Sequence, residues 1–363
     1  MLSDCPPQNV VEVSIFGPGK GESVLVHLGN KRWIIVDSCI DQRTSEVSAL
    51  SYLNRIGVDP AEAVLLVVAT HAHDDHFAGI AEVFRRCSNS QFVCSDALTT
   101  EEFFALTNAD ERMATGLRAH AFSEYREVFK LVRGRSAKGP GFRPLKYAVE
   151  LRPLLESPDG TRVLALSPSD EAISRARIAL RSAIPTPGSS RRPIRIDPNE
   201  LAVALWIEAQ GKSLLLGADL LAGPGGCGWM AVLAAFTPVN RASLFKVPHH
   251  GSVTGHHDDV WKELLQPAPL ALLAPFRAGK RPLPDPDDRT RILTLTSEAF
   301  ITASPRMPPV SKAVKREAAA LGPIARRPRE PWGTAGHVRA RCAEGEDVWN
   351  VEMWPPAQRL VFV

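Results

Sequence analysis

Several features that define other classes of protein are absent from this sequence. The six cysteines lie far apart and form no C-x-x-C pair, which excludes a disulfide framework or a cysteine zinc site and predicts reduced, mostly buried thiols. No apolar run approaches the length of a membrane span. Residues 1–9 lack a basic start followed by an apolar run, so we expect no signal peptide, no membrane partner and a cytoplasmic protein.

The charge and composition are those of an ordinary globular chain. A formal net charge of +3 is small for 363 residues and does not by itself indicate a nucleic-acid or membrane partner. A hydrophobic share of 44% is enough for a sizeable core. The 30 prolines crowd into the second half, which predicts many loops there, and no internal period indicates a repeat protein.

The first half predicts a mixed or parallel sheet. Val10–Phe16, Ser23–Leu28 and Arg32–Val36 are predicted strands. Thr44–Ile56 has helical spacing and precedes a continuous apolar run, Ala63–Ala69. Strand, helix and strand in this order form a βαβ unit.

The remaining segments alternate between the two periodicities. The predicted helices are Phe77–Cys87, residues 97–134, Asp170–Arg181, Asp258–Leu265 and residues 305–329. The predicted strands are Gln91–Cys94, Arg162–Leu166, Leu201–Ala209, Ser213–Gly217, Leu244–Val247, Leu270–Ala274, Ala299–Thr302 and a terminal hairpin from Gly336–Cys342 and Val348–Val363.

One short stretch carries most of the chemistry. Three histidines and two aspartates lie within six consecutive positions, His71–His76, one residue after the apolar run. Imidazole and carboxylate groups suit zinc and related divalent ions. The alternative, a His-rich polar turn, is disfavoured because a second histidine cluster and a further aspartate follow downstream.

Residues of ligand type also stand at the ends of other predicted strands. Asp37 follows Val36, Asp219 follows the strand that ends at Gly217, and His249-His250 follow Val247-Pro248. Loops at one edge of a sheet bring such residues together. Four strand ends with metal-ligand residue types therefore predict one shared site.

These motifs resemble a known family. Thr70-His71-Ala72-His73-Asp74-Asp75-His76 is a full match to the T-H-x-H-x-D-H signature of metallo-β-lactamase fold hydrolases, and Asp37 and Asp219 stand where that family has an early and a later aspartate motif. Lys246–Ser252 resembles the H-H-G-S form of the last motif, which is typical of a branch that includes the nuclease-like domain of competence DNA-uptake proteins. The resemblance covers roughly residues 10–305.

The resemblance implies an α+β fold, a four-layer αββα sandwich with two divalent metal ions at one edge. We expect one such domain over residues 1–305, in which the sequence pattern predicts a helical insertion at about 97–135 and a flexible Pro-, Gly- and Ser-rich loop at about 183–198. Residues 306–363 would be a C-terminal extension that packs on the same domain.

The ligand roles that the resemblance implies fall into two halves. His71 and His73 would bind the first ion, and Asp75, His76 and His250 the second, with Asp219 bridging both. Asp37 would orient the ligand loop by hydrogen bonds. His249 would be an alternative ligand or a substrate contact.

The sequence departs from the family pattern at one place. Many members supply a further histidine to the first ion, whereas here the corresponding region is Asp197-Pro198-Asn199-Glu200. Either Asn199 or water could complete that half. The ions are predicted to be Zn²⁺, with Mn²⁺ as the alternative.

The predicted reaction is hydrolysis by a metal-bridged hydroxide. The first hypothesis is cleavage of phosphodiester bonds, with nucleic acid among the substrates. The second is hydrolysis of small esters, lactones, thioesters or lactams. The third is a regulated effector or metal-binding partner protein with little activity of its own, whose partner the sequence does not identify.

Overall fold

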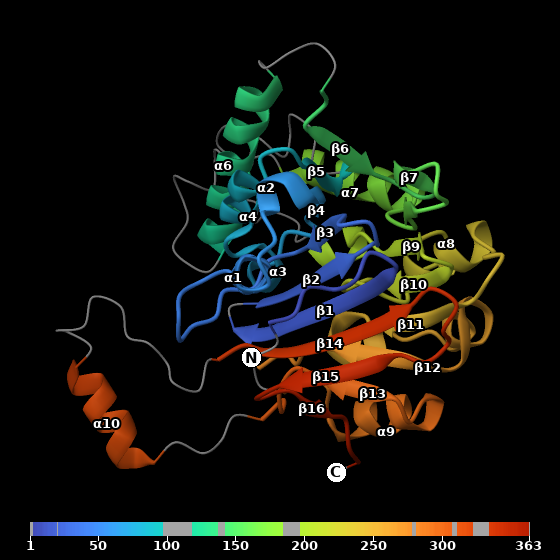
Figure 1. The fold of residues 1–363 in the computed structure, drawn as a ribbon. Helices are drawn as coiled ribbons and strands as arrows, with labels where there is room; N and C mark the ends of the chain where they lie inside the picture. Colours follow the sequence, from blue (N-terminus) through green and yellow to red (C-terminus); the bar gives the residue numbers. More distant parts are fainter. Residues whose placement is uncertain are drawn as a thin grey trace.

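Two mixed β-sheets, packed face to face, form the centre of the structure (Figure 1). The computed structural model describes residues 3–19, 21–96, 118–136, 142–183, 197–277, 281–306, 311–321 and 334–362. The predicted loop near Pro187 and residues 97–117 of the predicted helical insertion lie outside these ranges.

The first sheet contains eight strands, in which the N-terminal strands are flanked by strands from the C-terminus. In spatial order these are β15 (Asn350–Trp354), β14 (Gly336–Ala343), β1 (Val10–Gly19), β2 (Gly21–His27), β3 (Trp33–Val36), β4 (Val64–Val68), β5 (Gln91–Ser95) and β6 (Leu145–Ala148). The register pairs β3 with β4 in parallel, Val36 opposite Val68. The predicted βαβ unit is confirmed.

The second sheet also contains eight strands and takes up the middle of the chain. In spatial order these are β16 (Gln358–Arg359), β13 (Ala299–Ile301), β12 (Leu265–Leu273), β11 (Ala242–Lys246), β10 (Lys212–Leu216), β9 (Leu205–Ala209), β8 (Arg162–Ala165) and β7 (Arg152–Glu156). Here β10 and β11 are parallel, with Leu216 opposite Lys246.

The helices of the described ranges are short, apart from two. They are α1 (Ser48–Arg55), α2 (Pro60–Ala63), α3 (Asp74–Phe77), α4 (Ile80–Arg86), α6 (Arg118–Ser136), α7 (Asp170–Ala183), α8 (Gly228–Ala235), α9 (Pro286–Leu295) and α10 (Lys312–Leu321). Further helical turns are η2 (Pro198–Leu201), η3 (His249–Gly251), η4 (Val253–Gly255) and the π-helical η5 (Val260–Leu264). None of these helices combines the length and apolarity needed to cross a bilayer.

Apolar side chains form three layers, one between the two sheets and one on the outer face of each sheet, because successive residues of a strand point to opposite faces. Residues of one parity, such as Val24 of β2 and Leu244 of β11, meet between the two sheets. Residues of the other parity face outward: Leu25 packs with α1, α4 and α6, and Phe245 with α8, η5 and α9. Period-two burial on both faces explains why the strands are almost wholly apolar, and the predicted αββα sandwich is confirmed.

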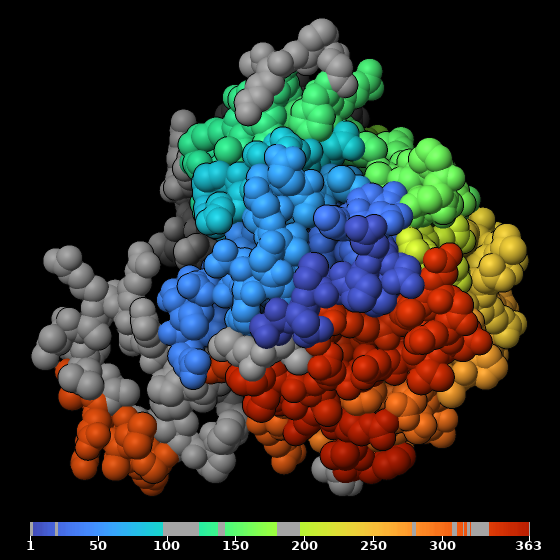
Figure 2. Space-filling model, viewed as in Figure 1, coloured from blue at the N-terminus to red at the C-terminus, as the bar shows by residue number. Residues whose placement is uncertain are grey.

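The C-terminal segment belongs to both sheets. Strand β14 pairs antiparallel with β1, and β16 pairs with β13. Figure 2 shows the C-terminal residues, in red, lying directly against the N-terminal residues, in blue. Strands β14 and β16 thus pack on the sheets that residues 10–301 form. The domain boundary between residues 305 and 306 stays a prediction.

Three predicted helices differ from the observed ones. The helix predicted over Thr44–Ile56 begins only at Ser48, because Ile40 and Val47 form a β-bridge before it. The helix predicted over Phe77–Cys87 is broken at Gly79, whose φ of 87° is left-handed. The helix predicted over Asp258–Leu265 is a five-residue π-helix, and Leu265 already belongs to β12.

Candidate metal centre

Four strands from the two sheets end at one edge of the sandwich. Asp37 follows β3, the His71–His76 loop follows β4, Asp219 lies three residues beyond β10, and His249-His250 lie beyond β11. The predicted convergence of four strand ends is confirmed. Because these strands are parallel in pairs, their carboxyl ends meet at the same edge.

The loops of this edge turn sharply. Asp37, Ala218, His249 and His250 all have positive φ, between 45° and 59°. Non-glycine residues rarely adopt this conformation, which costs about 1–3 kcal/mol at each position and concentrates at functional sites. The left-handed residues lie after β3, β10 and β11, and Ala218 and His249 each directly precede a candidate ligand, Asp219 and His250.

Asp37 is the buried support of the first loop. Its carboxylate accepts hydrogen bonds from the Thr70 amide at 2.8 Å, the Thr70 hydroxyl at 2.7 Å and His76 Nδ1 at 2.7 Å. The backbone N–H of Ser38 also donates to the His76 carbonyl at 2.9 Å. These contacts are those of an orienting carboxylate. That Asp37 acts in the reaction stays a prediction.

Each of three histidines is held by its Nδ1 atom. His76 Nδ1 donates to Asp37, and His250 Nδ1 donates to the Ala274 carbonyl at 3.1 Å. The Thr70 hydroxyl gives its proton to Asp37, so its oxygen accepts from His71 Nδ1 at 2.9 Å. A ring whose Nδ1 carries the proton presents a free lone pair at Nε2.

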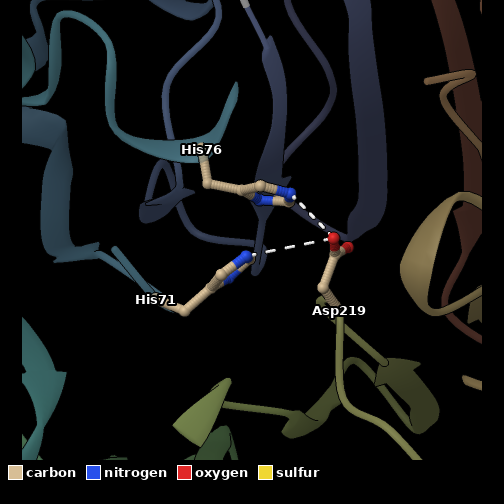
Figure 3. Close-up of side chains that lie close together, drawn as sticks. All are labelled: His71, His76 and Asp219. Atoms are coloured by element: carbon tan, nitrogen blue, oxygen red, sulfur yellow. Dashed lines mark ion pairs between the residues drawn. The ribbon is translucent and has the colours of Figure 1, made fainter. Parts of the chain in front are cut away.

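The three Nε2 atoms converge on the carboxylate of Asp219. Asp219 Oδ2 lies 3.9 Å from His71 Nε2, 3.3 Å from His76 Nε2 and 3.4 Å from His250 Nε2. Figure 3 shows the rings of His71 and His76 directed at Asp219. Asp75 Oδ2 approaches from the more open side, 3.3 Å from His250 Nε2.

This arrangement fits divalent metal ions. His71 Nε2, His76 Nε2, His250 Nε2 and Asp219 Oδ1 are buried and have no hydrogen-bond partner, and burying such atoms without a partner costs free energy. Ligand atoms within 4.8 Å of one another form two groups, one of His71, His76 and Asp219 and one of Asp75, His76 and His250. Imidazole nitrogens with carboxylates are the donor set that Zn²⁺ and Mn²⁺ use.

The electrostatics of the cluster favour a cation. Burial alone would lower the pKa of His76, but the carboxylates of Asp219 and Asp37 hold that pKa well above its usual value. His250 is affected in the same way, mainly by Asp219. For His71, burial and the neighbouring His76 keep the pKa well below its usual value. At His76 and His250 a metal ion would take the place of the Nε2 proton, so metal binding there would release protons, whereas the neutral His71 ring already presents a free Nε2 lone pair.

Besides Asp37, two predicted site residues, His73 and His249, lie outside both ligand groups. The ring of His73 is half-buried and stands edge-on to that of His71, with 4.9 Å between centroids. His249 Nδ1 contacts the Thr254 hydroxyl at 2.7 Å, and His249 Nε2 lies 3.4 Å from the Asn199 amide nitrogen. The ligand role of His73 and the substrate role of His249 stay predictions.

Asn199, which the sequence offered as one way to complete the first half of the site, lies beside His249. It is 5% exposed, and its Oδ1 is buried without a partner. The loop that carries it is fixed to the ligand loop, because the Val203 amide donates to the Thr70 carbonyl at 3.1 Å.

Two charged residues of the site were not identified from the sequence. Glu22 of β2 and Lys246 of β11 are each 2% exposed and form an ion pair beside the cluster. The sequence does carry a signal for both, since each is the one Asp, Glu, Lys or Arg residue of its strand. The sequence-based strand begins only at Ser23, which leaves Glu22 outside it, and Lys246 is named only within the H-H-G-S motif.

The fold and the cluster together define a class: a metal-binding αββα sandwich whose ligands lie at one sheet edge. A model of the Metallo-beta-lactamase superfamily matches residues 16–274. The chain therefore belongs to the metallo-β-lactamase superfamily, whose members are mostly metal-dependent hydrolases. No curated protein matches the sequence.

Solved structures of the same fold are distant in sequence. The metallo-β-lactamase fold protein YhfI from Bacillus subtilis shares 14% identity over 65% of this chain and 70% of its own, with a TM-score of 0.31. The Rm3 metallo-β-lactamase shares 13% over 72% of this chain and 84% of its own, with a TM-score of 0.34. The metallo-β-lactamase SMB-1 shares 13% identity over 68% of this chain and 81% of its own, with a TM-score of 0.32.

Proposed function

We propose that the protein is a metal-dependent hydrolase of phosphodiester bonds, with nucleic acid as the first substrate class to examine. The observation that carries the proposal is the set of three unpartnered histidine Nε2 atoms around the buried carboxylate of Asp219. The choice of phosphodiesters is supported by the resemblance of Lys246–Ser252 to the H-H-G-S motif of the competence-type branch.

The residues that would hold metal ions follow from the two ligand groups. His71 and Asp219 belong to one group, Asp75 and His250 to the other, and His76 to both. His76 has one free nitrogen and would bind one ion, so the two groups describe adjoining positions. Bound divalent ions would polarise a phosphoryl group and lower the pKa of coordinated water.

The protein groups around these positions have distinct tasks. Asp37 holds the His76 ring and, through Thr70, the His71 ring. The side chain of Asp75 is 27% exposed and His73 is half-buried, so this side would admit the substrate. His249 would contact the substrate at the rim, where Thr254 and Asn199 fix its ring.

The direct test is cleavage of labelled single- and double-stranded DNA and RNA by the purified chain with Mn²⁺ or Zn²⁺. We expect cleavage that EDTA stops and that the paired change His71→Ala/His73→Ala abolishes. The matched control is His256→Ala/His257→Ala, which removes two histidines outside the ligand groups and should preserve cleavage. Cleavage that persists in the His71→Ala/His73→Ala variant would contradict the proposal.

Parallel assays separate the alternatives. Turnover of esters, lactones or lactams, without cleavage of nucleic acid or bis-p-nitrophenyl phosphate, would favour the second hypothesis, hydrolysis of small substrates at the same site. Metal binding without turnover of any of these substrates would favour a regulated effector.

A further inference from the structure

A buried ion pair joins the two sheets beside the metal centre. Glu22 shares the inward face of β2 with Val24 and Val26, and Lys246 shares the inward face of β11 with Leu244. Glu22 Oε1 and Lys246 Nζ form an ion pair across the space between the sheets. The pair therefore lies at the end of the inter-sheet core, next to the loops that carry the ligands.

The pair contacts three members of the cluster. Glu22 Oε2 lies 3.4 Å from His250 Nδ1, and Glu22 Oε1 lies 3.9 Å from His76 Nδ1. Lys246 Nζ lies 3.7 Å from Asp219 Oδ1. These three residues come from three different loops, so one buried pair contacts each loop that supplies a candidate ligand.

The backbone is shaped to bring Glu22 to this position. Gly21 has a φ of 107°, and a Cβ there would lie 2.1 Å from the Asp75 carbonyl oxygen. Only glycine allows β2 to approach the ligand loop this closely. The close approach places the next residue, Glu22, behind the rings of His76 and His250.

Lys246 acts on the loop that carries Asp219. Its Nζ donates to the Ala218 carbonyl at 2.8 Å, and Ala218 is one of the left-handed residues, with a φ of 45°. This hydrogen bond holds the strained turn that directs Asp219 toward the histidines. The ammonium group also lies close enough to attract the Asp219 carboxylate directly.

The free-energy cost of the pair indicates a purpose other than stability. Burying an ion costs several kcal/mol, and an apolar pair of similar volume usually stabilises a fold as well or better. Glu22 Oε2 also has no hydrogen-bond partner of its own. A costly, incompletely satisfied pair in contact with three candidate ligands is best explained by the geometry that it imposes on them.

We infer that Glu22 and Lys246 are positioning residues of the metal centre. The Glu22 carboxylate lies 3.4 Å from His250 Nδ1 and attracts the N–H that donates to the Ala274 carbonyl, which favours the ring orientation with Nε2 toward the cluster. Lys246 holds the Ala218-Asp219 turn. The inference rests on the proposed function only in that these ligands bind divalent metal, and it concerns metal binding and geometry rather than the substrate.

The test compares Glu22→Gln with a matched substitution. Glu12→Gln removes another fully buried carboxylate, on the neighbouring strand β1, where it pairs with Arg341 far from the ligands in the fold. Chelator-treated full-length chains are titrated with Zn²⁺ or Mn²⁺ by calorimetry. We expect Glu22→Gln to weaken metal affinity by about 10–100-fold, as for other residues that orient ligands, and Glu12→Gln to retain wild-type affinity.

Cobalt substitution supplies a readout that a general loss of stability would not change. The visible absorption of bound Co²⁺ depends on ligand geometry, so Glu22→Gln should alter the spectrum at saturating metal and Glu12→Gln should not. Wild-type affinity and spectrum in Glu22→Gln would overturn the inference. An equal loss in Glu12→Gln would also overturn it.

The double variant Glu22→Gln/Lys246→Met covers the case in which one stranded charge prevents folding, because it removes both charges together. Weakened metal binding in the folded double variant supports the inference, and wild-type binding overturns it. A wild-type chain that binds metal but cleaves no phosphodiester contradicts the proposed function alone. A wild-type chain that binds no divalent ion overturns both.

Discussion

The protein contains two buried polar networks that differ in how completely they are satisfied. The metal centre leaves three histidine nitrogens and a carboxylate oxygen without hydrogen-bond partners. The second network lies in the first sheet and joins the N-terminal segment to β1, β14 and β15. Its members are Asp4, Glu12, Ser14, Tyr52, His337, Arg339, Arg341 and Glu352.

In the second network each buried donor meets an acceptor. Arg339 donates to Glu352 at 2.9 Å, to Tyr52 at 3.2 Å and to Asp4 at 2.9 Å. Ser14 donates to Glu12 at 2.8 Å and faces His337 Nε2 at 2.9 Å. None of these side chains has a buried atom without a partner. A closed network of this kind stabilises a fold, whereas an open one is organised for a ligand.

The largest difference between the two networks is expected from His76→Ala. His76 belongs to both ligand groups, so its loss should weaken metal affinity by more than about 100-fold, which exceeds the effect of residues that only orient ligands. Metal-dependent cleavage should disappear with it. Calorimetric titration and the nucleic-acid assay measure both effects.

Metal-dependent stabilisation provides the comparison with the second network. A metal concentration of 100 times the dissociation constant should stabilise the wild-type fold by about 2.7 kcal/mol. His76→Ala should lose this increment, and His337→Gln in the closed network should retain it. Thermal unfolding with and without EDTA reports the increment, and its survival in His76→Ala would remove His76 from the metal centre.

The reverse pattern, a loss of stability with unchanged metal affinity, is expected from Arg339→Met in the second network. Its partners Asp4 and Glu352 are 64% and 40% exposed, so water can solvate them when the guanidinium is removed. The free energy of unfolding should therefore fall by about 1.5–3 kcal/mol, the range for hydrogen bonds to charged groups. Metal affinity should stay at the wild-type value. Urea denaturation in EDTA, followed by metal titration, separates the two quantities.

The sequence predicted the open network better than the closed one. The positions of the candidate ligands Asp219 and His250 could be predicted because each follows a predicted strand, and parallel strand ends share an edge. Glu22 and Lys246 lie within strands of different sheets, and period two places each on an inward face without showing which residue it meets. The closed network depends on the same kind of tertiary pairing, because β14 lies beside β1 more than 300 residues away in the chain.

The smallest predicted effect is the contribution of His337, in the second network, to the pH dependence of stability. Burial, reinforced by the neighbouring Arg339, holds the pKa of His337 well below its usual value, so the folded protein keeps this ring neutral where an unfolded histidine, with a pKa of about 6.5, takes up a proton. Stability should consequently be unaffected by this group above pH 6.5 and fall below it by about 1.4 kcal/mol per pH unit. His337→Gln should remove that contribution.

Other buried histidines also change stability with pH: burial lowers the pKa of His27 to about 4, whereas Asp219 and other carboxylates raise the pKa of His76 and His250. The informative quantity is therefore the difference between the wild type and His337→Gln. Urea midpoints at pH 7.5, 6 and 5, all in EDTA, give this difference. If the two proteins lose stability in parallel below pH 6.5, His337 is protonated in the folded state. Its Nδ1 would then carry a proton that needs an acceptor, and the second network would be as open as the metal centre.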